Sequence, residues 1–171
     1  MSKKLEQLNK AVKETVETDF LNCCGSQSWA RMMTAARPFA DVAILLKQAE
    51  QIWQNLEPAH WLEAFAAHPK IGARKAAPKQ QLQSAEWSRG EQSGTQTANA
   101  AVLDALAEAN RLYEKKFGYI FIVCATGKSA EEMLDLCRRR LKNDAASEIR
   151  VAAREQRKIT EIRLKKLLEI E

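Results

Sequence analysis

The sequence predicts an all-α fold: a single-domain compact helical bundle of about seven or eight helices with one short extended buried segment. Three observations predict this fold. Residues of high helix propensity dominate a chain of 171 residues that has only 6 glycines and 4 prolines. Apolar residues recur every three or four positions along most of the chain. Only one run resembles a strand, and a single strand without a partner cannot form a sheet.

Length and composition limit the possible classes of protein. The length fits one domain, residues 1–171, with a substantial core. A formal net charge of +5 permits an anionic small-molecule substrate but does not require nucleic acid. No apolar run approaches the ~20 residues that a membrane helix needs, and the first residues lack the apolar core of a signal peptide. We therefore expect a cytoplasmic protein with no membrane association.

The cysteines show no spacing typical of a metal site, and the two histidines do not complete one. The simplest interpretation is reduced thiols in a cytosolic protein without a metal. The four residues are Cys23, Cys24, Cys124 and Cys137.

Apolar stripes and terminating prolines predict four helices in the first part of the chain. Their expected bounds are about 4–20, 30–36, 40–56 and 57–66. The buried face of the first helix is expected to carry Leu5, Leu8, Val12 and Val16. Pro58 falls in the first turn of the fourth helix, where its missing amide hydrogen is tolerated.

His68 is expected at the carboxyl end of that fourth helix, because Pro69 ends the helical pattern. Gly72 then permits a tight turn. The helix dipole would favour a histidine cation here by roughly 0.3–1 kcal/mol, which is a purely structural role. A histidine that exchanges protons near neutral pH is the functional alternative. The residues alone leave both open; the basic run 70–83 that follows is expected to be a surface loop.

Ser88 and Glu91 have the spacing of a helix capping box, which is the simplest explanation for both residues. Gly90 weakens this interpretation because glycine disfavours helix by about 1 kcal/mol relative to alanine. Ser129 and Glu132 have the same spacing, and there an apolar stripe follows directly. The second capping box is therefore the firmer prediction.

Helices are also expected at about 97–117, 129–141 and 145–168. Between the first two, Tyr119–Ala125 is the strand-like run, predicted to be extended and buried. Its backbone groups need partners, and a polar ligand could be one. The basic residues of the later helices are interpreted as a solvated face; they include Arg138, Arg139, Arg140, Arg150, Arg154 and Lys158.

Arg163 is the exception, since it lies four residues from both Ile159 and Leu167 and so falls on their apolar stripe. Its guanidinium could reach water from the edge of the stripe. Alternatively, it could turn inward against a carboxylate, because an unpaired buried cation is costly.

Several segments, in order and spanning nearly the whole chain, match one family. They are Cys23–Ser26 with Trp29, Arg37–Phe39, Ala67–Gly72, Glu91–Gly94, Lys116–Ala125, Arg140–Asn143 and Ile162–Leu164. With these segments the chain resembles the 2-oxo-4-hydroxy-4-carboxy-5-ureidoimidazoline (OHCU) decarboxylases of purine catabolism. The resemblance implies an all-α enzyme, usually a homodimer, that converts its small-molecule substrate to (S)-allantoin and CO2 with no metal or organic cofactor.

The resemblance also implies roles for individual residues. His68 and Glu91 would be catalytic. The residues implied to bind substrate are Ser88, Gln92, Arg163, Pro69, Phe121 and Val123, the last two through the backbone of the extended segment.

Two other classes of function compete with the decarboxylase. A helical nucleic-acid-binding module would use the basic terminal helices, but the basic residues are scattered and few aromatic residues are present for stacking. In a purely structural partner protein, His68 and Glu91 would only terminate helices.

Overall fold

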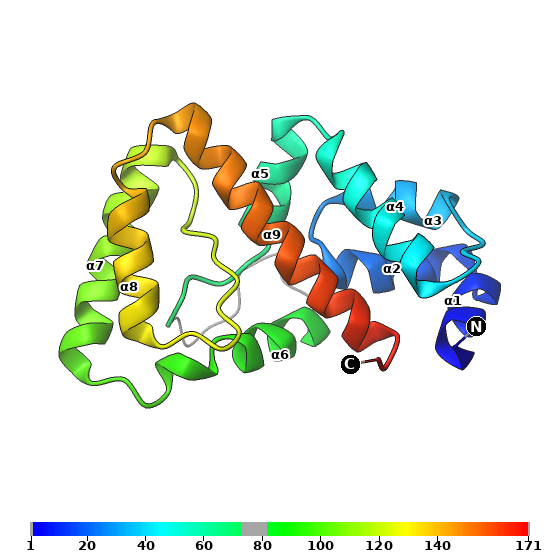
Figure 1. Ribbon diagram of the computed structural model, residues 1–171, viewed down its shortest axis with the longest axis horizontal. Helices are drawn as coiled ribbons and strands as arrows, with labels where there is room; N and C mark the ends of the chain where they lie inside the picture. The colour runs from blue at the N-terminus through cyan, green and yellow to red at the C-terminus, as the bar shows by residue number, and fades with distance from the viewer. Residues whose placement is uncertain (1, 73–81, 171) are drawn as a thin grey trace. The chain divides into compact units, whose positions relative to one another are not determined.

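A computed structural model describes residues 2–72 and 82–170, and in these residues all regular structure is helical (Figure 1). The all-α prediction is therefore confirmed, with slightly more helices than expected. The elements are α1 (Lys3–Lys10), α2 (Lys13–Cys23), α3 (Gln27–Ala35), α4 (Val42–Gln54), α5 (Pro58–Ala66), α6 (Leu82–Glu91), the 3₁₀-helix η1 (Ser93–Thr95), α7 (Ala100–Phe117), α8 (Ala130–Arg140) and α9 (Ala145–Leu167). Most of the surface loop predicted at 70–83 lies outside the described residues. No helix in the described ranges is both long and apolar enough to cross a membrane.

The described chain divides into two compact units. Unit 1 comprises residues 2–64 and 157–170, and unit 2 comprises residues 65–72 and 82–156. Two helices cross the division: α5 ends in unit 2, and α9 begins in unit 2 and ends in unit 1. The organisation of residues 1–171 as a single domain stays a prediction.

The prediction of one continuous helix at 4–20 is wrong. In unit 1, α1 ends at Lys10, and Val12 is extended as the residue before α2, with a side chain that is 66% exposed. Leu5, Leu8 and Val16 are buried as expected. A regular spacing of apolar residues does not reveal a short break in a helix when the residues on both sides of the break are buried with or without it.

The core of unit 1 is built around aromatic residues of α2 and α3, which lie side by side. Phe20 meets Trp29 edge-on, with ring centroids 5.8 Å apart. The indole N–H of Trp29 donates to the carbonyl oxygen of Ala49 at 3.1 Å and so ties α3 to α4. The predicted stripe of α4 is buried at Leu45, Ala49, Ile52 and Trp53.

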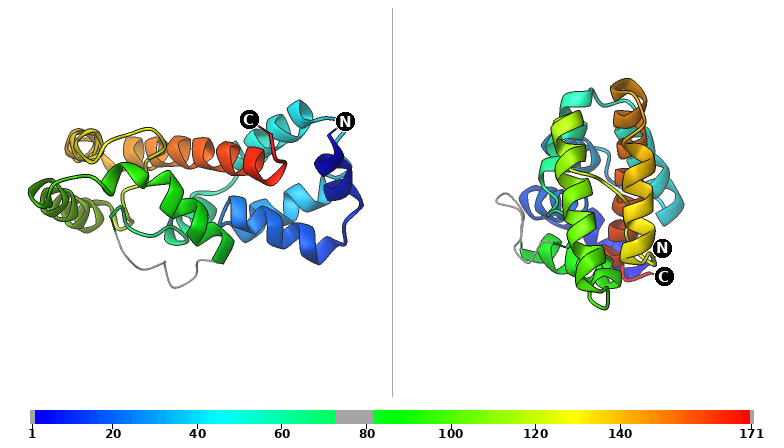
Figure 2. Two further views of the ribbon diagram at one scale, coloured as in Figure 1. Left: turned by 90° about the horizontal axis from the view of Figure 1, so that it is seen from below. Right: turned by 90° about the vertical axis from the view of Figure 1, so that its left-hand side faces the viewer.

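In unit 2, α7 and α8 lie side by side and run in the same direction (Figures 1 and 2). The chain between them must therefore travel back along the pair. An extended segment does this with few residues, because it advances about 3.3 Å per residue against 1.5 Å in a helix. Phe121–Ala125 are buried and belong to neither helix nor strand, as predicted for this segment.

Both ends of this connection have the predicted form. Gly118 adopts a left-handed conformation (φ +80°) immediately after α7. At α8, the Ser129 hydroxyl oxygen accepts from the Glu132 amide at 3.2 Å, and the Glu132 carboxylate accepts from the Ser129 amide at 2.8 Å. The capping box at Ser129 is therefore confirmed.

Arg140 corrects the prediction of a solvated basic face. Its side chain is buried and donates through Nε to the buried Glu148 carboxylate at 2.7 Å and through Nη1 to the Ile122 carbonyl at 2.6 Å. The Tyr113 hydroxyl donates to the same carboxylate. Burial, together with this carboxylate, raises the pKa of Tyr113. The guanidinium thus satisfies a backbone group of the extended segment, which its position in the sequence did not indicate.

Two glycines near the end of α6 provide a test of the packing in unit 2. A Cβ added to Gly90 would meet no atom within 4 Å, whereas one added to Gly94 would lie 2.0 Å from the carbonyl oxygen of Lys128. We expect Gly90→Ala to stabilise the protein by up to about 1 kcal/mol through helix propensity. Gly94→Ala should destabilise it by about 1–3 kcal/mol, because backbone must shift. Urea unfolding midpoints measure both, and equal shifts of the same sign would contradict this packing.

Candidate active site

His68 follows the end of α5, as the sequence predicts. The helix ends at Ala66, and the His68 amide donates to the Phe65 carbonyl oxygen at 3.1 Å. The imidazole is partly exposed, and its Nε2 lies 2.7 Å from the side-chain oxygen of Gln156 on α9. Pro69 follows directly and is also partly exposed. The ring is thus held at one nitrogen by a residue that sequence reasoning missed.

Gln156 has a side chain with no exposed surface. It lies three residues after Ala153 and three before Ile159, so it occupies the apolar stripe of α9. Like Arg163, Gln156 is a polar residue on that stripe. A polar side chain in a buried stripe was the signal that could have found it.

The interpretation of Ser88 and Glu91 as a capping box is wrong. α6 begins at Leu82, so both residues lie in its last turns rather than at its start. Both are buried, with Glu91 only 7% exposed. A carboxylate at the carboxyl end of a helix is disfavoured by the helix dipole. A buried glutamate in this place therefore lacks the simple structural explanation that the spacing offered.

Gln92 follows α6 and contacts the His68 loop. Its side-chain oxygen accepts a hydrogen bond from the Gly72 amide at 3.0 Å. Gly72 has a φ of +78°, a conformation that suits glycine. The stretch from His68 to Gly72 is therefore fastened at both ends by glutamine oxygens, from Gln156 and from Gln92.

The extended segment brings a second set of groups to unit 2. The Cys124 amide donates to the Glu155 carboxylate at 2.8 Å, and the Cys124 carbonyl oxygen accepts from the Lys128 ammonium at 2.8 Å. The Ile122 carbonyl oxygen accepts from Arg140, as described above. No hydrogen bond from another described residue reaches the backbone of Phe121 or Val123. The backbone partners thus alternate along the segment.

Glu91 acts electrostatically on this segment. Burial raises the pKa of the Cys124 thiol, the Lys128 ammonium lowers it, and the carboxylates of Glu155 and Glu91 raise it further. The Glu91 carboxylate therefore lies close enough to the extended segment to affect the pKa of a side chain there.

Arg163 belongs to unit 1, on the carboxyl half of α9. Its side chain is only 2% exposed, and its guanidinium donates to the Asn22 carbonyl oxygen at 3.3 Å. Reaching water from the edge of the stripe is therefore the wrong interpretation of this residue. The other predicted site residues, from His68 to Val123, all belong to unit 2.

The four cysteines are free and buried. Burial raises the pKa of Cys24 to about 12 and that of Cys137 to about 11. Thiolates are the nucleophilic and metal-binding form, so these side chains behave as packing residues at neutral pH. In the described part of the chain, no group of three histidine, cysteine or acidic residues could hold a metal ion.

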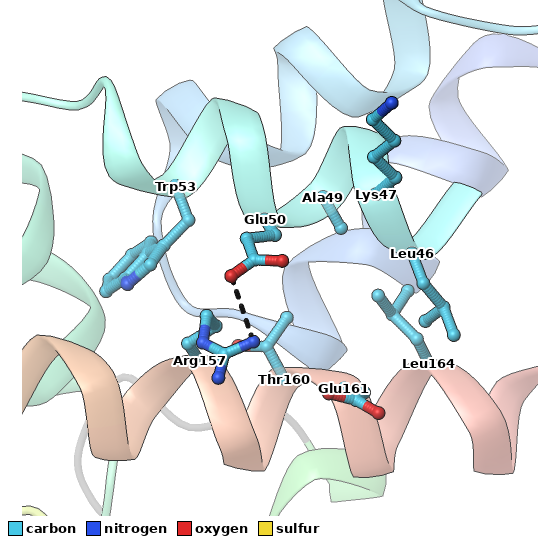
Figure 3. A pocket seen from close by; sticks show the side chains of 9 residues that line it. All are labelled: Leu46, Lys47, Ala49, Glu50, Trp53, Arg157, Thr160, Glu161 and Leu164. Atoms are coloured by element: carbon cyan, nitrogen blue, oxygen red, sulfur yellow. Dashed lines mark ion pairs between the residues drawn. The ribbon is translucent and has the colours of Figure 1, made fainter. Parts of the chain in front are cut away.

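A cavity of about 240 Å³ opens in unit 1 between α4 and α9 (Figure 3). Trp53, Leu46 and Leu164 contribute apolar walls, and an ion pair of 3.1 Å between Arg157 and Glu50 crosses it. None of the predicted site residues lines this cavity. It is also smaller than the roughly 300 Å³ at which small-molecule pockets usually begin.

Comparison with known proteins identifies the family. The sequence profile of the OHCU decarboxylases matches residues 9–165, which include parts of both units. The chain belongs to the OHCU decarboxylase family.

Two relatives are similar to this chain in sequence, and two solved structures are similar to it in fold. The uric acid degradation bifunctional protein TTL of Arabidopsis thaliana is 42% identical over 156 residues, which cover 90% of this chain and 48% of that protein. The chain thus spans about half the length of that relative. The 2-oxo-4-hydroxy-4-carboxy-5-ureidoimidazoline decarboxylase of Amia calva is 32% identical over 145 residues, covering 82% of this chain and 79% of that protein.

Among solved structures, OHCU decarboxylase crystallised in the presence of (S)-allantoin aligns with a TM-score of 0.77 and 38% identity, over 93% of this chain and 99% of that one. A structure of (S)-allantoin synthase aligns with a TM-score of 0.69 at 16% identity, over 95% of this chain and 53% of that one. This second likeness concerns the fold alone.

Proposed function

We propose that this protein catalyses the cofactor-independent decarboxylation of OHCU to (S)-allantoin and CO2 in urate degradation. Its membership of the family supports this proposal, as does the name of the Arabidopsis relative. The observation that carries it is that this family member holds the stretch from His68 to Gly72 in unit 2 by hydrogen bonds to the side chains of Gln156 and Gln92.

The substrate itself explains why the proposed reaction needs no cofactor. Its C4 carries a carboxylate and a hydroxyl, and the adjacent C5 forms an imine. When the bond between C4 and the carboxylate breaks, its electron pair forms a C4=C5 double bond. The C5=N pair then moves to nitrogen, which takes a proton. The molecule is its own electron sink, a task that other decarboxylases give to an organic cofactor.

Selectivity arises in the second half of the proposed reaction. The C4 hydroxyl gives up its proton as the carbonyl forms, and C5 receives one from a single face. A histidine is suited to this transfer because its ordinary pKa is close to neutral. We propose His68 as the residue that handles this proton and Glu91 as the carboxylate that orients the imidazole or engages the hydroxyl.

Backbone groups of the extended segment are proposed to bind the polar edges of the ring. In an extended chain, the N–H and C=O of successive residues point to opposite sides. The backbones of Ile122 and Cys124 are bonded to side chains of unit 2. Phe121 and Val123 therefore present their backbone groups to the other side, where a substrate with several N–H and C=O groups could pair with them. Ser88, Gln92 and Pro69 are proposed to complete the substrate contacts.

Arg163 is proposed to grip a carboxylate or ureido oxygen, because its planar guanidinium can donate two parallel hydrogen bonds. Arg163→Lys keeps the charge but loses that geometry, so KM should rise at least tenfold while kcat changes less. Steady-state kinetics measure the split, with the melting temperature as a check on folding. A folded variant with an unchanged KM would remove Arg163 from the proposed site.

The proposed function is tested by generating the substrate in place. Urate is oxidised and hydrolysed enzymatically, and the chirality of the allantoin is followed by circular dichroism. Spontaneous decay gives a racemate, so an optical signal of the (S) enantiomer reports catalysis. Only racemic allantoin, at any protein concentration, would overturn the proposal.

Assembly and location are proposed on the same basis. We propose a homodimer with one OHCU decarboxylase domain per chain, which light scattering after gel filtration tests directly. A cytoplasmic location is consistent with four buried cysteines that form no disulfide.

A further inference from the structure

We infer that Gln156 is a positioning residue for His68: its side-chain oxygen fixes the imidazole as the tautomer with hydrogen on Nε2, so that Nδ1 is the basic nitrogen of the neutral ring. The inference rests on the proposed function for its catalytic meaning. The tautomer and orientation of the ring follow from the contact between the two side chains alone.

The contact defines which nitrogen carries the hydrogen. The amide oxygen of Gln156 lies 2.7 Å from Nε2 of His68, and an amide oxygen only accepts hydrogen bonds. Nε2 must therefore be the donor. In the neutral ring the other nitrogen, Nδ1, is then an acceptor, and in the cation it becomes a second donor.

The environment of Gln156 makes this choice firm. Its side chain is fully buried on α9, between the buried residues Ala153 and Ile159. Rotation of the imidazole that moved Nε2–H away would break this 2.7 Å hydrogen bond to a buried oxygen, so the contact favours one orientation of the ring.

The chemical identity of the partner also matters. A carboxylate behind a histidine stabilises the imidazolium and raises its pKa. A neutral amide orients the ring without adding a negative charge there. The ring can then give its proton to carbon more readily than it could with an anion bound to Nε2.

The competing explanation is that the hydrogen bond between His68 and Gln156 only stabilises the fold, by joining the residues after α5 to α9. Two variants separate the explanations. Gln156→Leu keeps the approximate volume but removes the acceptor. Gln156→Glu keeps an acceptor and adds the charge that the native residue lacks. A purely stabilising role predicts changes in melting temperature without a change in the pH profile of kcat.

The experiment reads the tautomer directly by nitrogen NMR on protein labelled with ¹⁵N-histidine. The chain has only two histidines, so a His60→Gln variant leaves His68 as the single signal. We expect the Nε2–H tautomer in the otherwise native protein and a shift toward the other tautomer in Gln156→Leu. In Gln156→Glu the tautomer should be retained and the His68 pKa should rise by at least one unit.

Kinetics complete the test. We expect Gln156→Leu to lower kcat by about 10–100-fold with little change in KM, in line with the effect of residues that orient an active group. His68 is proposed to give its proton to carbon, so kcat should fall at high pH, where the imidazolium has lost that proton. In Gln156→Glu this fall should occur at a higher pH. Hydrogen on Nδ1 in the native protein would overturn the inference, and so would native kcat in folded Gln156→Leu. A wild-type protein that makes only racemic allantoin would overturn the proposed function instead, and the tautomer would still test the geometry.

Discussion

His68→Ala is expected to reduce kcat by about 10²–10⁴-fold, because general acid–base catalysis by one side chain contributes in that range. The substrate should still bind, since its carboxylate, ureido and ring groups are proposed to contact other residues. The loss should appear in single-turnover measurements of (S)-allantoin formation, which report the chemical step rather than product release.

The same variant should remain folded at 25 °C. The backbone bond from His68 to Phe65 is unaffected by the side chain, but the buried oxygen of Gln156 loses its hydrogen bond to Nε2. We expect a loss of about 1–3 kcal/mol in the free energy of unfolding for that reason. His60→Ala, in the preceding helix α5, is the matched control and should keep native turnover. Substantial turnover by folded His68→Ala would show that another group moves the proton.

Glu91→Gln is expected to separate activity from stability. The substitution removes the charge and preserves the shape, so kcat should fall by about 10²-fold or more if the carboxylate orients His68 or stabilises developing charge. The free energy of unfolding should hold or rise slightly. A carboxylate at the carboxyl end of α6 opposes the helix dipole, with a cost of about 0.3–1 kcal/mol that glutamine avoids.

The control for this prediction is Glu86→Gln, an exposed glutamate of the same helix. It should leave turnover unchanged. Thermal melting and the circular dichroism assay are run on both variants and on the wild type. If Glu91→Gln lost stability and kept its rate, Glu91 would be a structural residue and the proposed site would need another carboxylate.

Helices that carry a continuous apolar stripe were predictable from the sequence. The stripe of α4 and the capping box of α8 recur in the structure because burial and local hydrogen bonds determine them directly. The extended segment was predictable for a different reason: a strand-like run without a partner has few other forms. Its backbone partners, Arg140 and Glu155, were not predictable, because they come from distant parts of the chain.

The errors have a common physical origin. The spacing of Ser88 and Glu91 fits the start of a helix, but the helix begins at Leu82, in a stretch without an apolar period. Spacing between two residues does not determine at which end of a helix they lie. Arg140 was assigned to solvent with the other basic residues of the later helices, because these residues scatter around the helices. In the structure it is buried, where it donates to the Glu148 carboxylate, eight residues away, and to the Ile122 carbonyl oxygen.

For the candidate site, sequence reasoning named His68, Ser88, Glu91 and Gln92, and the structure places them all in unit 2. Gln156 was missed because glutamine is uncharged and attracts less attention on an apolar stripe than arginine does. Arg163 was noticed on the same stripe by its charge. Tertiary contacts, rather than local pattern, distinguish a glutamine that orients a histidine from one that merely fills space.

The division of the chain gives the hydrogen bond between His68 and Gln156 a topological meaning. Unit 1 is discontinuous, and the described residues between its two segments form unit 2. His68 lies just after the chain enters unit 2, and Gln156 is the last residue before it leaves. Closing a loop of this length costs on the order of 4 kcal/mol in chain entropy. The hydrogen bond that holds the imidazole therefore also joins the two ends of that loop, where the chain enters unit 2 and where it leaves it.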